Sequence, residues 1–281
     1  MVMATFPIAF EKMSGTGNDF VIIDNRTLRI PPEEQPELAR KICRRMFSVG
    51  ADGLIFIEDS SKADFGWNFY NADGSVAEMC GNGSRCAARF AYRHKIVEKK
   101  KMKLETLAGI VEAEICEEET VVRVKMTQPH DFRLGLSLQL GDEERPVAYV
   151  NTGVPHAVIF VGEEDVPVKT WGRKVRFHQL FEPKGANANF VTLLPDGRLK
   201  VRTYERGVEA ETMACGTGAV AAALFAAIQK GMESPVEVVT SGGGLLTILF
   251  DVFDGPVVEN VYLQGPTRLI CTGNLTAEAL L

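Results

Sequence analysis

Short apolar runs bounded by turn residues recur along the chain, and longer runs with apolar residues at helical spacing interrupt them. Short runs rich in β-branched residues are typical of strands, whereas apolar residues spaced three or four apart are typical of helices. The pattern predicts strands at 20–24, 54–57, 67–70, 102–106, 109–115, 121–126, 157–161, 189–194, 199–204, 236–240, 245–250 and 258–264. It predicts helices at 36–47, 80–94, 171–181 and 214–227.

The predicted elements follow one order twice: strand, helix, two strands, helix. Many strands and few helices in each half favour a curved sheet around one central helix. The helix at 214–227 is apolar all round, which is typical of a helix enclosed by its domain. The helix after Cys80 is more polar, with Arg85, Arg89 and Arg93, so we expect it to be less enclosed.

A repeated motif relates the two halves. Residues 80–91 read CGNGSRCAARFA and residues 215–226 read CGTGAVAAALFA. The same offset, within one residue, relates three further pairs of landmarks: Gly50-Ala51 with Gly185-Ala186, Thr16-Gly17 with Thr152-Gly153, and Tyr70 with Tyr204. Such self-similarity indicates a duplicated unit. We therefore expect two domains, residues 1–122 with 268–281 carrying Cys80, and residues 123–267 carrying Cys215.

Composition narrows the class of protein. The 281 residues are 46% hydrophobic and 24% charged, as in ordinary globular proteins. A net charge of −6 argues against a nucleic acid partner. Every apolar stretch is shorter than the roughly 18–20 residues that cross a bilayer, and the first residues lack the pattern of a secretory signal. We expect a cytoplasmic protein with neither nucleic acid nor membrane as partner.

The six cysteines are scattered without a C-x-x-C pair, which argues against a disulfide framework and against a metal site. Free cysteine is among the most buried residue types, so we assign Cys43, Cys116 and Cys271 to the core. Cys86, whose repeat partner is Ala221, is also expected to be a small core residue.

Cys80 and Cys215 differ from the others because each precedes a Gly-x-Gly loop at a predicted helix N-terminus. Such a position lowers the pKa of a thiol from about 8.5 to about 3.5–7.5. The Gly-x-Gly loop directs backbone N–H groups at an anion, and a substrate carboxylate fits this description. With both thiols at one α-carbon, one removes its proton while the other donates a proton to the opposite face. The motif therefore predicts inversion of an α-carbon.

Four segments closely resemble the diaminopimelate epimerase family: SGTGNDFVIIDNR, NADGSVAEMCGNGSRCAARF, GANANFV and YERGVEAETMACGTGA. The resemblance extends from about residue 10 to residue 266. The family interconverts LL- and meso-2,6-diaminopimelate without pyridoxal phosphate, on the route to lysine and peptidoglycan. The resemblance implies an α+β fold of two pseudo-symmetric α/β domains. Each is a curved, mostly antiparallel, barrel-like sheet around a central helix, with the active site in the cleft.

The resemblance also implies roles for individual residues. Cys80 and Cys215 match the two acid/base thiols, and no cofactor is expected. The reacting carboxylate is expected at four first-turn amides, those of Gly81, Asn82, Gly216 and Thr217. Residues expected to contact the distal amino acid centre, which is not inverted, are Asn18, Asn71, Asn187 and Arg206. Glu205 is expected near the substrate ammonium group and the thiols, and His156 matches a histidine that tunes thiol protonation.

Three positions depart from the family pattern. Val154 stands where many members have asparagine, so that contact is lost or replaced, and Asn151 is a candidate substitute. Gly53 stands where some members have a substrate-facing glutamine. Cys271 aligns roughly with a tyrosine at the family's dimer contact, and the expectation of a homodimer comes from the resemblance.

Other classes of function stay open at this point. Proline racemase-like enzymes also use two thiols, but on a cyclic amino acid without a second charged centre, and Arg206 favours the longer dicarboxylate. A thiol redox protein usually has a resolving cysteine close by, often as C-x-x-C. A non-catalytic anion-binding module would need the helix amides but not the cysteines.

Overall fold

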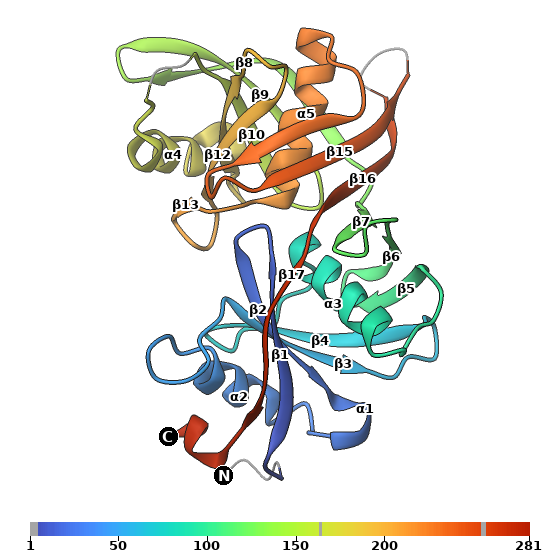
Figure 1. The fold of residues 1–281 in the computed structure, drawn as a ribbon. Coiled ribbons are helices and arrows are strands. Elements are labelled where there is room, and N and C mark those ends of the chain that lie inside the picture. The colour runs from blue at the N-terminus through green and yellow to red at the C-terminus, as the bar shows by residue number, and fades with distance from the viewer. Residues whose placement is uncertain (1–4, 163–164, 254–256) are drawn as a thin grey trace. The chain divides into compact units, whose positions relative to one another are not determined.

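The structure is a computed structural model that describes residues 5–162, 165–253 and 257–281 (Figure 1). It divides into two compact units, Met1–Val124 with Gly265–Leu281, and Lys125–Gln264. The limits predicted from the sequence lie two or three residues from these. In the described residues no helix is long and apolar enough to cross a membrane.

The first unit is a mostly antiparallel sheet with helices. Its strands are β1 (Ile8–Gly15), β2 (Asn18–Asp24), β3 (Gly53–Glu58), β4 (Phe65–Asn71), β5 (Lys101–Thr106), β6 (Gly109–Ile115), β7 (Val121–Lys125) and β17 (Arg268–Leu275). Its helices are α1 (Asn25–Leu28), α2 (Gln35–Ile42), α3 (Gly81–Arg93) and the 3-10 turn η2 (Ala277–Leu280). The strands pair antiparallel in the order β17-β1-β2-β3-β4-β5-β6-β7, except for the parallel pairs β2–β3 and β4–β5.

Opposite faces of this sheet pack different helices. Leu38 of α2 packs in one core cluster with Leu54 and Phe56 of β3. Successive strand residues point to opposite faces, so Ile55 points the other way, where it lies beside Gly83 of α3. Helix α3 contacts β1, β2, β3, β5 and β6, which means that the sheet curves around it (Figure 1).

The second unit repeats this plan. Its strands are β8 (His130–Leu140), β9 (Glu143–Asn151), β10 (Pro155–Phe160), β11 (Asn187–Leu193), β12 (Leu199–Glu205), β13 (Ala210–Thr212), β14 (Val236–Thr240), β15 (Leu245–Val252) and β16 (Val258–Pro266). Its helices are α4 (Val168–Arg176), the 3-10 turn η1 (Gln179–Phe181) and α5 (Gly216–Lys230). The pairs β10–β11 and β12–β14 are parallel, and the others are antiparallel. Helix α5 contacts β9, β10, β11, β12, β14 and β15, as α3 does in its own sheet. The predicted fold class is confirmed.

The two central helices are more alike in burial than the sequence predicts. Helix α3 is buried from Gly81 to Ala91 apart from Arg89, and Arg85 is completely buried. The Arg85 guanidinium donates a hydrogen bond of 2.9 Å to the Thr16 hydroxyl. Arg89 donates to the Thr267 carbonyl at 2.6 Å. Arg85 and Arg89 are therefore bonded inside the unit, and only Arg93 of the three is exposed, so the expectation of a less enclosed helix is wrong.

Two predicted helices differ in extent from those observed. The helix predicted at 36–47 ends at Ile42, and Met46 and Phe47 beyond it are largely exposed. Met46 adopts the left-handed region with a φ of 68°, which a helix cannot continue through. The helix predicted at 171–181 is α4, Val168–Arg176, and its last predicted residues form η1 instead.

The core assignment holds for some cysteines only. Cys43 and Cys86 are buried, and Cys116 is half-buried. Cys86 matches Ala221 in being completely buried, as the repeat predicts. Cys271 is exposed on β17, so its assignment to the core is wrong. Its neighbours Ile270 and Thr272 are exposed too, which shows that this part of the strand is uncovered on both faces.

Candidate functional site

In the first unit Cys80 is the N-cap residue of α3. Its backbone is extended (φ −146°, ψ 119°), and its Sγ accepts a hydrogen bond of 3.4 Å from the Gly83 N–H. The thiol takes the place of the oxygen that usually caps a helix. The Gly81 and Asn82 amides follow in the first turn, where a helix N-terminus binds anions.

Two of the predicted asparagines lie beside this thiol. Asn18 Oδ1 is 3.7 Å from Cys80 Sγ and 3.5 Å from Asn82 Nδ2. Asn82 is buried, and its Oδ1 has no hydrogen-bond partner among the described residues. Asn18, Cys80 and Asn82 thus form one polar cluster at the start of α3.

Asn71 ends β4, and its side chain bonds within its own turn, donating to Ser75 Oγ at 3.0 Å. Gly53 of β3 is its partner in the strand register. A Cβ at Gly53 would lie 2.5 Å from the Phe69 ring and 2.8 Å from the Tyr70 carbonyl oxygen. The position therefore has no room for the glutamine that some relatives carry.

In the second unit Cys215 is the N-cap residue of α5, also with an extended backbone (φ −125°, ψ 106°). Its Sγ lies 3.5 Å from the Thr217 hydroxyl. The third residue of the motif, Gly218, packs closely against β11, since a Cβ there would lie 2.3 Å from Asn189 Oδ1. Both cysteines therefore occupy the same place in related elements, as the repeat predicts.

His156 of β10 is completely buried between two asparagines of β11. Its Nδ1 is 3.1 Å from Asn189 Nδ2, and its Nε2 is 3.4 Å from Asn187 Nδ2. Burial lowers the pKa of His156 to about 3, with a smaller lowering from the Arg206 charge, while the Asn189 hydrogen bond opposes the shift. His156 is therefore a neutral group at physiological pH.

Glu205 is the last residue of β12 and Arg206 follows it, and both are half-buried. Asn187 Oδ1 accepts a hydrogen bond of 2.7 Å from the Arg206 backbone N–H, which ties this turn to β11. The Arg206 guanidinium donates weakly to the Lys184 carbonyl at 3.4 Å. Among the described residues no carboxylate forms an ion pair with it, so its charge is available to an anion.

Asn151, the candidate substitute contact, ends β9. Its Oδ1 accepts from the Gly153 N–H at 2.9 Å, which closes a turn. The next residue, Thr152, donates to the Thr217 carbonyl at 3.1 Å, so the turn lies beside the N-terminus of α5. This places Asn151 near the Cys215 motif, with its oxygen already used.

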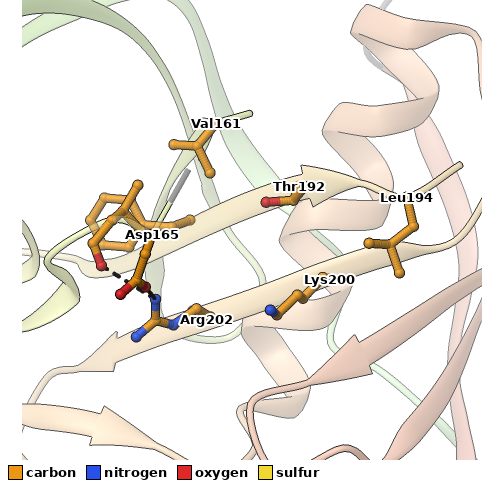
Figure 2. A pocket seen from close by; sticks show the side chains of 8 residues that line it. Val161, Asp165, Thr192, Leu194, Lys200 and Arg202 are labelled. Carbon is orange, nitrogen blue, oxygen red and sulfur yellow. Dashed lines mark hydrogen bonds and ion pairs between the residues drawn. The ribbon is translucent and has the colours of Figure 1, made fainter. Parts of the chain in front are cut away.

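A pocket of about 360 Å³ lies elsewhere in the second unit (Figure 2). Its lining residues are Val161, Asp165, Val166, Phe190, Thr192, Leu194, Lys200 and Arg202. Arg202 is neutralised by Asp165 at 2.7 Å and by Glu211 at 2.9 Å. None of the predicted site residues lines this pocket.

Two residues that were not among the predicted site residues contact members of that set. Asp52 accepts from Asn18, and Asn189 bonds His156. Asn189 carried a signal, because it is two residues after Asn187 and so shares a strand face with it. Nothing local in the sequence marks Asp52 as a partner of Asn18. The described part of the chain holds no group of three or more His, Cys, Asp or Glu side chains that could bind a metal ion.

Comparison with known proteins identifies the relatives of this chain. The sequence model of the family described as diaminopimelate epimerase matches residues 10–131 and 148–270. The diaminopimelate epimerase of Aquifex aeolicus is 45% identical over 96% of this chain and 99% of its own length. That of Methanothrix thermoacetophila is 41% identical over 97% of this chain and 98% of its own length.

Solved structures share the fold at low identity. A phenazine biosynthesis protein of the PhzF family from Bacillus anthracis superposes with a TM-score of 0.76 at 16% identity, covering 97% of this chain and 100% of its own. A probable proline racemase from Agrobacterium radiobacter superposes with a TM-score of 0.71 at 16% identity, covering 96% of this chain and 93% of its own. At this identity the likeness concerns the fold alone.

Proposed function

Because this chain belongs to the diaminopimelate epimerase family, we propose that it interconverts LL- and meso-2,6-diaminopimelate without a cofactor, in the biosynthesis of lysine and peptidoglycan. The observation that carries the proposal is the matched pair of N-cap cysteines, Cys80 on α3 and Cys215 on α5. A core cysteine has no need of a helix N-terminus, whereas a thiol that handles protons next to a carboxylate does.

The proposed reaction is a proton exchange at one α-carbon. One thiolate takes the α-proton, so that an S–H bond forms as the Cα–H bond breaks. The other thiol then gives its proton to the opposite face of the carbon, which inverts the centre. The first-turn amides of Gly81-Asn82 and Gly216-Thr217 would hold the carboxylate, which also carries the charge that develops when the proton leaves.

The remaining residues of the proposed site would select the substrate. Arg206, which has no carboxylate partner among the described residues, suits the distal carboxylate, since a guanidinium binds carboxylates through two parallel hydrogen bonds. Asn18, Asn71 and Asn187 would supply polar contacts to the distal centre, and Asn187 also fixes the Arg206 backbone. Glu205 would meet the ammonium group. Glu205 and His156 would tune the thiols, His156 as a neutral dipole.

The proposed function is tested by measuring the incorporation of deuterium into LL-diaminopimelate, with the reduced protein in deuterated water. We expect solvent deuterium at one α-carbon and formation of the meso isomer. Cys80→Ala and Cys215→Ala should each lower inversion by roughly 10²–10⁴-fold, as loss of an essential acid or base does. Cys86→Ala, which removes a buried thiol from the same helix as Cys80, is the matched control and should retain activity.

Two results would contradict the proposal. One is a lack of exchange into diaminopimelate by the reduced wild type. The other is full activity in either cysteine variant, because neither thiol alone can serve both faces. Exchange into proline instead would favour the cyclic substrate of the proline racemase class.

The proposed function extends to assembly and location. We infer a homodimer formed through β17, where Ile270 is 53% exposed beside the exposed Cys271. A cytoplasmic location would suit the proposed chemistry, because a pair of thiols that transfers protons must stay reduced, and thiols stay reduced in that compartment.

A further inference from the structure

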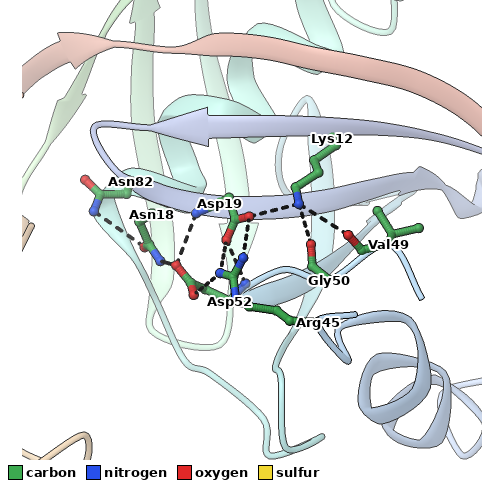
Figure 3. A network of polar contacts seen from close by, with 8 residues as sticks. All are labelled: Lys12, Asn18, Asp19, Arg45, Val49, Gly50, Asp52 and Asn82. Atoms are coloured by element: carbon green, nitrogen blue, oxygen red, sulfur yellow. Dashed lines mark hydrogen bonds and ion pairs between the residues drawn. The ribbon is translucent and has the colours of Figure 1, made fainter. Parts of the chain in front are cut away.

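We propose that Asp52 is a positioning residue, whose carboxylate holds the Asn18 amide with its oxygen turned toward the Cys80 thiol. The inference rests on the proposed function for the role of Cys80. In the proposed site Asp52 contacts neither the Cys80 thiol nor the substrate, and it acts through Asn18. Figure 3 shows the network around it.

The geometry defines the orientation of the amide. Asn18 Nδ2 donates a hydrogen bond of 2.6 Å to Asp52 Oδ2. An ionised carboxylate only accepts, so the nitrogen of the amide must face it. The amide oxygen is then directed to the other side, where it lies 3.7 Å from Cys80 Sγ and 3.5 Å from Asn82 Nδ2. Among the described residues the second N–H of the Asn18 amide has no acceptor, which leaves it available to a substrate.

Asp52 is itself held in place by a charged network (Figure 3). Its Oδ1 pairs with Arg45 at 2.9 Å, and its Oδ2 also accepts from the Asp19 N–H at 3.2 Å. The Asp52 N–H donates in return to Asp19 Oδ1 at 3.0 Å. Arg45 also pairs with Asp19 at 2.8 Å, and Lys12 pairs with Asp19 at 3.0 Å. The carboxylate that orients Asn18 is therefore held by two further groups, the Arg45 guanidinium and the Asp19 N–H.

The charge of Asp52 contributes little to folding. Its side chain is 42% exposed, and exposed ion pairs contribute little to the stability of a protein. Asp19 is more buried; burial alone would raise its pKa, but hydrogen bonds and charges from Arg45 and Lys12 lower it overall. Asp19 thus anchors the network, whereas Asp52 connects it to the amide beside the thiol.

The test is a double-mutant cycle between Asp52→Asn and Asn18→Ala. Asparagine at position 52 can accept or donate, so it no longer selects one orientation of the Asn18 amide. We expect Asp52→Asn to lower kcat for deuterium exchange by roughly tenfold or more, with a smaller change in KM. In the Asn18→Ala background the same substitution should have no further effect, since Asp52 acts through Asn18.

A second measurement needs no substrate. The rate of alkylation of Cys80 by iodoacetamide is followed against pH by peptide mapping. The Asn18 amide oxygen accepts the Cys80 S–H and so favours the protonated thiol over the thiolate. Loss of this acceptor in Asn18→Ala, or of its orientation in Asp52→Asn, should therefore move the midpoint of alkylation to lower pH. The double variant should match Asn18→Ala alone. A further shift in the double variant would mean that Asp52 acts by its charge, and the proposal would fail.

Two more variants separate positioning from folding. Asp24→Asn removes a carboxylate at the far end of β2 that pairs with Arg26, and should leave kcat and the alkylation midpoint unchanged. Asp52→Glu keeps an acceptor-only carboxylate and should retain more activity than Asp52→Asn. The reverse order, or wild-type behaviour of Asp52→Asn, would overturn the inference. A wild type that does not epimerise diaminopimelate but shows the expected alkylation cycle would contradict the proposed function alone.

Discussion

At the scale of single residues, burial determines what His156 can contribute. The ring is completely buried, and its neighbours are amides without net charge apart from the more distant Arg206. A group whose pKa is lowered to about 3 stays neutral while any thiol titrates. Its effect on proton transfer would therefore come from the orientation of its ring dipole, and Asn189 fixes that orientation.

The same burial predicts a pH dependence of stability. The pKa of His156 is lower in the folded state than the ordinary value of 6.5, so its contribution is complete above pH 6.5 and is lost as the pH falls toward 3. Between pH 6.5 and 4.5 the loss should be about 2–3 kcal/mol. Urea unfolding of wild type and His156→Gln at several pH values measures it: the variant should lack this part of the slope. His130→Gln, at an exposed histidine, should keep it. Equal slopes in wild type and His156→Gln would contradict the assignment.

At the scale of elements, the starts of α3 and α5 look alike in sequence but differ in packing. Gly83 and Gly218 are equivalent in the repeat. A Cβ at Gly83 would meet Ile55 and Trp67 at 3.4 Å, an ordinary contact. At Gly218 it would lie 2.3 Å from Asn189 Oδ1, inside the hydrogen-bond network of His156. The glycine is thus required by space in one helix only.

This difference gives a matched pair of substitutions. Gly218→Ala should destabilise the protein by about 1–3 kcal/mol, because the methyl group overpacks the site and displaces Asn189. It should also lower the proposed activity. Gly83→Ala should be neutral or stabilising, since alanine is favoured over glycine inside a helix by roughly 0.5–1 kcal/mol. Thermal unfolding and exchange rates of both variants test this. Similar losses in both would show that the packing difference does not matter.

Most elements could be predicted from the sequence, and those that could not have physical reasons. β8 is absent from the predicted strands, although its alternation of Phe and Leu with other residues is a strand signal. β1 and β17 carry no such signal, because Glu11 is buried and Ile270 is exposed. The cysteine motif predicted both helix starts. The contact from Asp52 to Asn18 could not be predicted, because it joins through their side chains the first residue of β2 and the residue just before β3, which are far apart in the sequence.

At the scale of the whole molecule, duplication explains why two related units each carry one thiol. The two units nevertheless differ in the polar groups that they provide, as the sequence predicts. The first unit surrounds Cys80 with amides, whereas the second supplies Arg206, a cation with no carboxylate partner among the described residues. Two copies of the chain would associate through β17, because Ile270 and Cys271 are exposed on opposite faces of that strand.

Assembly through β17 predicts a change in mass when that strand is made polar. Light scattering of wild type should give about twice the 30.8 kDa of one chain. Ile270→Glu should reduce it to one chain, because a carboxylate buried without a partner opposes association. Leu107→Glu changes another exposed apolar residue of the first unit, between β5 and β6, and should keep the dimer. A monomeric wild type, or a dimer that survives Ile270→Glu and dissociates with Leu107→Glu, would show that β17 is not the contact.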